Sequence, residues 1–106
     1  MEPPTYAENA FKVVALFPKT NNDGMPFDKD VWSWWRDRLI MLQFNYSRTG
    51  DVFGVWKGQS DTSVAIYWVV RTHKEVDRIW NFVREAGVKF EQKEMYFEIS
   101  SIYFDF

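Results

Sequence analysis

Residues 62–87 have the sequence TSVAIYWVVRTHKEVDRIWNFVREAG. The first part, residues 62–71, is mostly apolar and rich in β-branched and aromatic side chains, which predicts a strand buried on both faces for much of its length. Thr72 and Glu75 then have the spacing of a capping box, a typical helix start. Apolar side chains follow at the helical spacing i, i+3, i+4 and i+7, at Val76, Ile79, Trp80 and Val83. Because Gly87 suits a left-handed residue after a helix, we predict the helix over residues 73–86.

The N-terminal half repeats this order of strand and helix. Residues 11–17 (FKVVALF) alternate in a way that predicts a central strand, and residues 19–24 (KTNNDG) have the composition of a loop. A second helix is expected from about Asp28, which can cap free N–H groups, to about Gln43. Its apolar stripe consists of Val31, Trp35, Leu39 and Leu42. Trp32 and Arg36, like Trp34 and Arg38, are four residues apart and can stack, although core packing of these rings is the favoured interpretation.

The remaining segments predict strands. Residues 44–57 (FNYSRTGDVFGVWK) allow either a tight hairpin at Gly50 or one long strand bent by bulges at Gly50 and Gly54, and we prefer the bent strand. Residues 58–61 (GQSD) predict a turn. Residues 90–106 return to strand, with a bend or bulge expected at Ser100 and Ser101. In this strand Met95, Phe97 and Ile99 share one side, and Glu94, Tyr96 and Glu98 share the other.

The order β-α-β-β-α-β is the split β-α-β, or ferredoxin-like, pattern. We therefore expect an α+β domain in which two helices cover one face of a four-stranded antiparallel sheet. The length of 106 residues suits one domain. We assign this domain to residues 11–106, after a flexible N-terminal segment, residues 1–10.

Several features resemble an uncharacterised family of small bacterial ferredoxin-like proteins. They are the tryptophan helix after an acidic turn, Gly54-Val55-Trp56, the apolar strand at residues 64–70, and Phe90 with Gln92 before the last strand. The resemblance covers about two-thirds of the chain by elements. It does not extend to the acidic tail or the extra segment at residues 100–106. It implies the fold but no activity, since the family has none assigned.

Composition excludes several classes of function. The chain has no cysteine, so it lacks disulfides, thiolate metal sites and a cysteine nucleophile, and a reducing, cytoplasmic location is expected. We expect neither a signal peptide nor a membrane span, because no apolar run is long enough. A net charge of −2 argues against general nucleic-acid binding. His73 is the only histidine, and we predict no metal site, cofactor or catalytic residues.

Aromatic content is the unusual property, at 20% with six tryptophans and ten phenylalanines. One small core cannot easily take all of these rings, so some should lie at a surface, pocket or interface. Side chains of opposite phase to the core are expected to face away from the helices: Tyr46, Trp56, Tyr67 and Tyr96. The candidate interface residues are Tyr46, Tyr67 and Phe97. The candidate ligand-binding residues are Arg38, Arg48, Trp56, Lys57 and Tyr96.

Three functions fit these patterns. The preferred one is a non-catalytic module, acting as a homo-oligomer, that holds a small planar or anionic, nucleotide-like ligand between subunits by aromatic stacking and arginine contacts. A phage or defence-related protein that sequesters a nucleotide signal would be one biological version. The alternatives are a structural subunit with an aromatic dimer interface, and a cofactor-independent enzyme of the dimeric α+β-barrel type. The enzyme is weakened by the lack of an acid–base pair.

Overall fold

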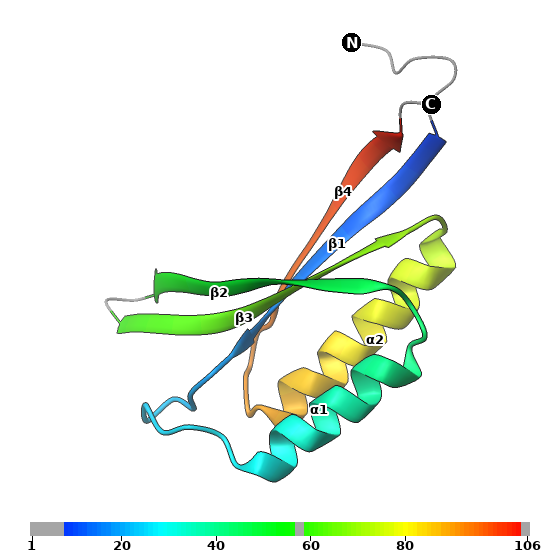
Figure 1. Cartoon of the computed structure of the whole chain (residues 1–106). Helices are drawn as coiled ribbons and strands as arrows, with labels where there is room; N and C mark the ends of the chain where they lie inside the picture. Colours follow the sequence, from blue (N-terminus) through cyan, green and yellow to red (C-terminus); the bar gives the residue numbers. More distant parts are fainter. Residues whose placement is uncertain (1–7, 57–58, 105–106) are drawn as a thin grey trace.

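The computed structural model describes residues 8–56 and 59–104. It contains, in chain order, β1 (Glu8–Pro18), α1 (Lys29–Met41), β2 (Tyr46–Trp56), β3 (Gln59–Val70), α2 (His73–Lys89) and β4 (Tyr96–Phe104). The strands form one sheet in the order β2-β3-β1-β4, and every neighbouring pair is antiparallel. The two helices lie side by side against one face of this sheet (Figure 1). This is the predicted ferredoxin-like α+β fold.

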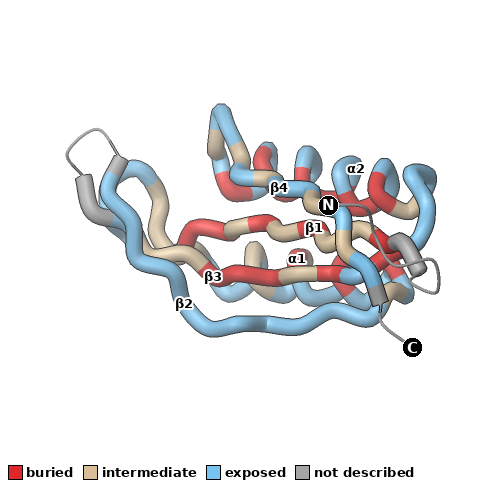
Figure 2. The backbone as a smooth tube through the Cα atoms, turned by 90° about the horizontal axis from the view of Figure 1, so that it is seen from above, coloured by how far each residue is buried: buried red, intermediate tan, exposed pale blue. Residues whose placement is uncertain are grey.

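The two central strands carry most of the buried sheet residues. Val13 of β1 lies opposite Trp68 of β3 and Ile99 of β4, and opposite residues in antiparallel strands share a face. Val13 and Trp68 are fully buried under the helices. Figure 2 shows this difference between central and edge strands: β1 and β3 are largely buried, whereas β2 is exposed along its length. The strand at residues 62–71 is therefore central, as its apolar run predicts, although it starts earlier, at Gln59.

Aromatic rings fill the layer between sheet and helices. The ring of Phe17 lies 5.3 Å from Trp35, 5.7 Å from Phe82 and 6.2 Å from Phe90, measured between centroids. Trp35 and Leu39 are the buried residues of α1, as the predicted stripe requires. The core thus takes many of the rings, and other large apolar residues remain exposed, including Tyr46, Phe53 and Tyr96.

Two predictions about the ends of the helices are wrong. Asp28 stands at the N-cap of α1, but its side chain makes no capping hydrogen bond. Gly87 is not the left-handed residue that ends α2, because the helix continues to Lys89. The left-handed residue is Glu91, with φ 54°, and the N–H of Gln92 donates to the carbonyl of Gly87 at 2.8 Å. Glycine at 87 is instead explained by close packing, since a β-carbon there would lie 3.0 Å from Met95 Cγ.

The preferred bent strand is present in β2, with one bulge rather than two. The register with β3 shifts between Arg48 and Gly50, and Gly50 has φ 103°, which glycine adopts most easily. Pairing continues without a shift through Gly54, so the second expected bulge is absent. The predicted turn at residues 58–61 is wrong from Gln59 onward, because β3 starts there.

The expected bulge at Ser100 and Ser101 is also wrong. Ser100 lies opposite Lys12 and Ser101 opposite Phe11, within a register that runs unbroken from Tyr96 to Phe104. No slip is needed, because Ile102 lies on the face of the sheet away from the helices. β1 also begins at Glu8, three residues before the expected strand, so residues 8–10 belong to the sheet.

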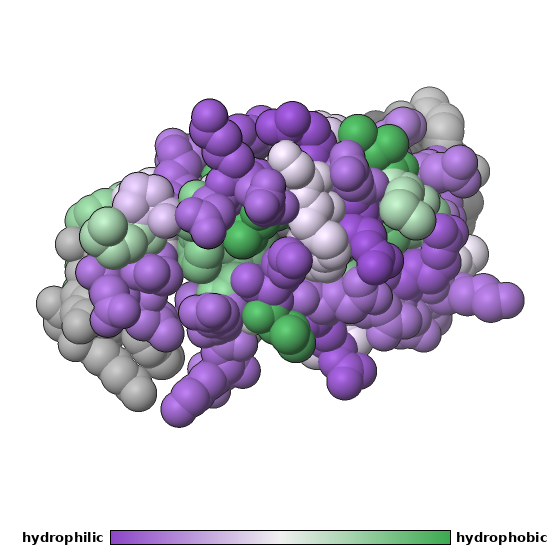
Figure 3. Space-filling model, turned by 90° about the horizontal axis from the view of Figure 1, so that it is seen from below, coloured by the Kyte–Doolittle hydropathy of each residue, from purple (hydrophilic) through white to green (hydrophobic). Residues whose placement is uncertain are grey.

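The molecule is elongated. The described residues span 50 × 32 × 21 Å, with a radius of gyration of 15.5 Å, whereas a compact domain of this size has about 13 Å. Figure 1 shows why: the sheet is strongly twisted, and the β2–β3 hairpin extends beyond the helices. The side seen from below in Figure 3 is mostly hydrophilic, with small separate hydrophobic areas. Within the described ranges, no helix is long and apolar enough to cross a membrane.

Candidate functional site

A cleft of about 450 Å³ lies where the end of β1, the start of α1 and the base of the β2–β3 hairpin meet. Each element contributes for a local reason. β1 ends at Pro18, the loop before α1 turns at Gly24 with φ 80°, and β2 bends at the Gly50 bulge. The residues lining this cleft, called the tryptophan cleft below, are Lys19, Thr20, Pro26, Trp32, Trp35, Arg36, Arg48 and Val64.

Two tryptophans on α1 form the aromatic wall of the tryptophan cleft. Trp32 meets Trp35 edge to face, with centroids 5.3 Å apart, and meets Phe90 at 5.0 Å. Trp35 is nearly buried, whereas Trp32 is half-buried. The contacts with Trp35 and Phe90 fix the Trp32 ring, so Trp32 is a preformed surface on which a flat ligand can stack.

The tryptophan cleft is also positively charged. Lys19 and Arg48 both form ion pairs with Asp51, the second at 3.2 Å. The hydrogen bond from Lys19, followed by that from Arg48, holds the pKa of Asp51 below its usual value. Arg36 has no ion pair within the part of the chain that the structure describes. Three cations and one carboxylate leave a local charge of +2 around the rings.

Among the predicted ligand-binding residues whose side chains the structure describes, one lies in this cleft. Arg48 lines it, but Arg38 lies over Trp34, 5.7 Å from the ring centroid, and pairs with Glu85 of α2 at 3.4 Å. The backbone of Trp56 pairs with Gln59 at the end of the hairpin. The side chain of Trp56 and the whole of Lys57 lie outside the described residues.

Tyr96 is on the other edge of the sheet from Arg48. β3 and β1 lie between β2 and β4, which separates the two edges by roughly 14 Å at normal strand spacing. The Tyr96 hydroxyl donates to Glu98 at 2.6 Å, and this interaction raises the pKa of Tyr96. Tyr96 and Arg48 of one chain therefore do not line a common site.

The predicted interface residues are divided between the two faces of the sheet. Tyr67 lies on the face without helices, where Lys12 Nζ is 4.7 Å from its ring centroid. Tyr46 lies opposite Trp68 and so on the helix side, contrary to the predicted orientation. Phe97 is also on the helix side, with its ring 4.8 Å from Trp80. The open face, as we call the helix-free side, carries Val14, Leu16, Ala65, Tyr67, Val69 and Tyr96 together with the charged residues Lys12 and Glu98.

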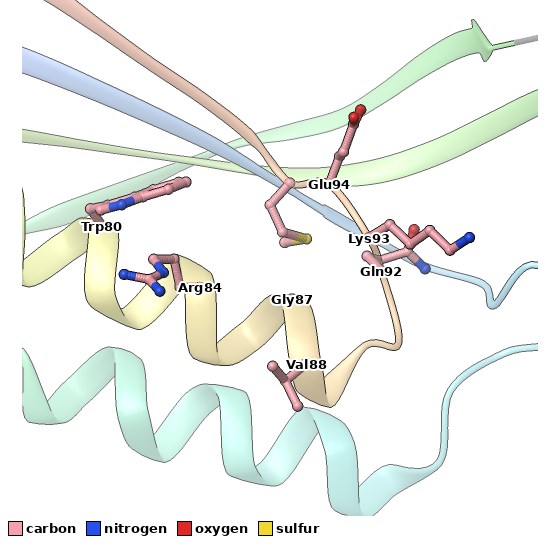
Figure 4. Close-up of a pocket in the computed structure, with 8 residues that line it drawn as sticks. Trp80, Arg84, Gly87, Val88, Gln92, Lys93 and Glu94 are labelled. Carbon is pink, nitrogen blue, oxygen red and sulfur yellow. The ribbon is translucent and has the colours of Figure 1, made fainter.

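A second cleft, of about 530 Å³, lies between α2 and the segment that enters β4. It is lined by Trp80, Arg84, Gly87, Val88, Gln92, Lys93, Glu94 and Met95. In Figure 4 the charged ends of Arg84, Lys93 and Glu94 point away from one another. Because its polar groups do not converge on one point, this cleft is the weaker candidate for a charged ligand.

Catalytic and metal-binding groups are sparse. His73 lies at the start of α2, with its ring 4.8 Å from that of Phe11. Across residues 8–56 and 59–104, no group of three or more His, Cys, Asp or Glu side chains could hold a metal ion. The lining of the tryptophan cleft provides aromatic rings for stacking and three cationic side chains.

Sequence reasoning missed four of the residues that give the tryptophan cleft its character: Lys19, Trp32, Trp35 and Arg36. The spacing of Trp32 and Arg36 does place them on one helix surface, which was a usable indication. No sequence pattern links Lys19 to these residues, because Lys19 is distant from them in the sequence and comes near α1 only when the chain folds.

No family model matches the sequence, and no curated protein matches it. Similar solved structures exist. A phage SAM lyase in its apo state superposes with a TM-score of 0.56 at 15% identity, over 99% of this chain and 90% of that one. The same kind of enzyme in complex with S-methyl-5′-thioadenosine gives 0.52 at 13% identity, over 98% and 94%.

Two uncharacterised proteins are similar as well. A DUF3240 family protein from Shewanella baltica OS155 gives a TM-score of 0.54 at 13% identity, over 92% of each chain. A dimeric ferredoxin-like protein of unknown function from Thermobifida fusca YX gives 0.52 at 14% identity, over 96% of this chain and all of that one. These similarities show the fold, and the resemblance to small uncharacterised ferredoxin-like proteins holds at that level.

Proposed function

We propose that this protein binds a small planar, anionic ligand of the nucleotide type in the tryptophan cleft, without chemical conversion, and acts as a homo-oligomer. The observation that carries the proposal is the fixed ring of Trp32 beside Arg36, a guanidinium without an ion pair among the described residues. Stacking of a base on an aromatic ring contributes about 1–3 kcal/mol. A guanidinium supplies the charge-assisted hydrogen bonds that phosphate and carboxylate groups accept.

The size and chemistry of the tryptophan cleft support binding rather than catalysis. Its volume of about 450 Å³ is in the normal range for small-molecule sites. Its ionisable lining residues are Lys19, Arg36 and Arg48, all cations. The nearby carboxylate, Asp51, accepts from two of them and has a lowered pKa, so it is a weak general base.

The comparison with the phage SAM lyase gives secondary support. That protein has been solved in complex with S-methyl-5′-thioadenosine, so this fold can hold a nucleoside-type ligand. A protein that sequesters a nucleotide signal, in a phage or in defence against one, is the biological role we favour. Trp56 and Lys57 remain proposed ligand contacts, supplied by a neighbouring subunit, whereas Tyr96, on the opposite edge of the sheet, is not among them.

Isothermal titration calorimetry tests the ligand. The panel is adenosine, AMP, ATP and S-methyl-5′-thioadenosine, with inorganic phosphate as a charge control. We expect binding of at least one nucleotide, at least tenfold weaker in Arg36→Ala and Trp32→Leu. Arg38→Ala is the matched control, because Arg38 is on the same helix but outside the cleft.

Two results would count against the ligand proposal: no heat from any member of the panel, or equal losses in Arg36→Ala and Arg38→Ala. Chromatography of the titrated mixtures separates binding from turnover, because a non-catalytic protein returns each ligand unchanged.

A structural subunit is the second candidate, and the open face favours it. Val14 and Leu16 lie on that face beside Tyr67, where the described chain places no helix over them. If a second copy covers this face, Tyr67→Asp should halve the mass measured by light scattering, and no nucleotide should raise the melting temperature.

A further inference from the structure

The outer half of β2 is an unprotected sheet edge. β2 is the first strand of the sheet order, and no strand in the described residues pairs with its outer side. Beyond the bulge, residues 52–56 have the sequence VFGVW, without charge or proline, and pair regularly with β3. Phe53 is 69% exposed and Val55 is 67% exposed. Long, regular, apolar edges of this kind readily add another strand.

The opposite edge of the sheet differs. β4 also exposes apolar side chains, Tyr96, Ile99 and Tyr103, but its middle carries Glu98 and the pair Ser100 and Ser101. Charged and small polar side chains weaken edge-to-edge pairing. If both edges were left free to associate, the sheet could extend without limit, whereas an edge interrupted by a carboxylate and two serines leaves the uncharged β2 edge to form a closed pair.

The hairpin also receives little cover from its own chain. In Figure 1 the ends of β2 and β3 extend past both helices, and Figure 2 shows this part of β2 as exposed. An isolated two-stranded ribbon is marginally stable in water. Val52 on one face and Phe53 on the other are both exposed, so both faces of the ribbon gain from a partner.

The sequence of this edge is nearly symmetric about Gly54. In an antiparallel pair of two copies centred on Gly54, Phe53 of each copy lies opposite Val55 of the other. Aromatic and β-branched residues in opposite positions are a stabilising cross-strand pair, and the two-fold axis forms that pair twice. Gly54 carries no side chain at the axis, and the space above it on the face of the sheet is open, with no heavy atom within 4 Å of a β-carbon position.

We propose that two copies of this chain pair through residues 52–56 of β2, antiparallel and centred on Gly54, and so form one continuous sheet. The proposal deepens the homo-oligomer part of the proposed function by naming its interface, and it does not depend on the tryptophan cleft. The occupant is a second copy because the edge is complementary to itself.

A disulfide test measures the register directly. At the centre of an antiparallel pair, facing Cα atoms are about 4.5–5.5 Å apart, within the range that a disulfide bridges. The chain has no cysteine of its own. We expect Gly54→Cys to form a covalent dimer on mild oxidation. The control Ile99→Cys, half-exposed on the other edge strand, should remain monomeric on a non-reducing gel.

Charge substitutions test the same register in solution. The double variant Phe53→Lys with Val55→Lys places lysines opposite each other and should shift the molecule to monomer by sedimentation velocity. Phe53→Lys with Val55→Glu places Lys opposite Glu twice and should restore the dimer. Circular dichroism checks that each variant is folded.

Three outcomes would overturn the pairing: a monomeric parent protein at 100 µM, a dimer that survives the double lysine change, or equal crosslinking of both cysteine variants. Calorimetry with the nucleotide panel on the double lysine variant separates this result from the ligand proposal. If the parent is monomeric and still binds a nucleotide, only the pairing proposal fails, and if the parent is dimeric and gives no ligand heat, only the ligand proposal fails.

Discussion

Met95 Cγ lies 3.0 Å from the point that a β-carbon on Gly87 would occupy. Gly87 is a buried residue within the last turns of α2, and Met95 immediately precedes β4. A glycine in a helix costs about 1 kcal/mol relative to alanine. Because Gly87 has no side chain, Met95 can pack closely against α2, and this packing offsets the cost of the glycine.

A double-mutant cycle on this pair measures that offset. Gly87→Ala alone should change the free energy of unfolding little, because the gain in helix propensity is opposed by the contact with Met95. In a Met95→Ala background the same change should stabilise the protein by about 0.5–1 kcal/mol. Urea denaturation of the four proteins gives the coupling, and simple additivity would show that the two residues do not interact.

Glu75 should make the start of α2 sensitive to acid. The Thr72 hydroxyl donates to Glu75 Oε1 at 2.9 Å, as do the backbone N–H groups of Thr72 and Arg71, and these bonds lower the pKa of Glu75 from its usual 4.5. Because the pKa of Glu75 is lower in the folded state than in the unfolded state, the charged carboxylate stabilises the protein fully above about pH 4.5. This stabilisation is lost as pH falls through the lowered pKa of the folded state.

The variant Glu75→Gln isolates this charge, because glutamine can still accept the same hydrogen bonds. Parent and variant should differ by about 0.3–1 kcal/mol at pH 7. The difference should shrink as pH falls below 4.5 in urea melts. A difference that stays constant down to pH 2 would contradict the role of the charged carboxylate.

Gly50 should be the less replaceable glycine of β2. Its φ of 103° is strained for any other residue, although a β-carbon would meet no atom within 4 Å. Gly50→Ala should therefore cost about 1–3 kcal/mol through the backbone alone. Gly54→Ala is the matched control, with equal space and no positive φ, and it should be neutral or stabilising by up to about 1 kcal/mol. Thermal unfolding at low protein concentration compares the two.

Phe17 should be the most costly phenylalanine to remove. It is fully buried, and its ring contacts those of Trp35, Phe82 and Phe90. Phe17→Ala should cost about 3–5 kcal/mol. Phe53→Ala, at a residue that is 69% exposed, should change the stability of the monomer by about 0.5 kcal/mol or less. Similar losses in the two variants would show that the core is placed wrongly.

The parts of the fold that were predictable are those whose causes are local. The capping box of Thr72 and Glu75 and the apolar stripe behind it define α2 from sequence alone. Its end was missed because the role of Gly87 depends on Met95, which lies outside the helix. The bend at Gly50 was predicted, but the orientation of Tyr46 was not, since a strand's facing depends on which partner residues it meets.

The candidate site was less accessible to sequence reasoning. Arg36 and Arg38 are two residues apart on α1, yet one lines the tryptophan cleft and the other pairs with α2. Side chains two residues apart on a helix point in directions that differ by about 200° around its axis. Only the packed structure shows which of these directions faces β1 and β2. Arg48 was among the predicted ligand-binding residues, but its neighbours in the cleft come from other elements.

The tryptophans lie at graded depths, and this provides the protein with built-in optical reporters. Trp68 is fully enclosed, Trp35 is nearly so, Trp32 is half-buried, and Trp80 is 37% exposed. Of the tryptophans whose exposure the structure describes, Trp80 should be quenched by iodide first, and Trp68 emission should stay almost unchanged. A ligand stacked on Trp32 should protect the emission of Trp32 from iodide, so ligand binding in the tryptophan cleft can be followed without an attached dye.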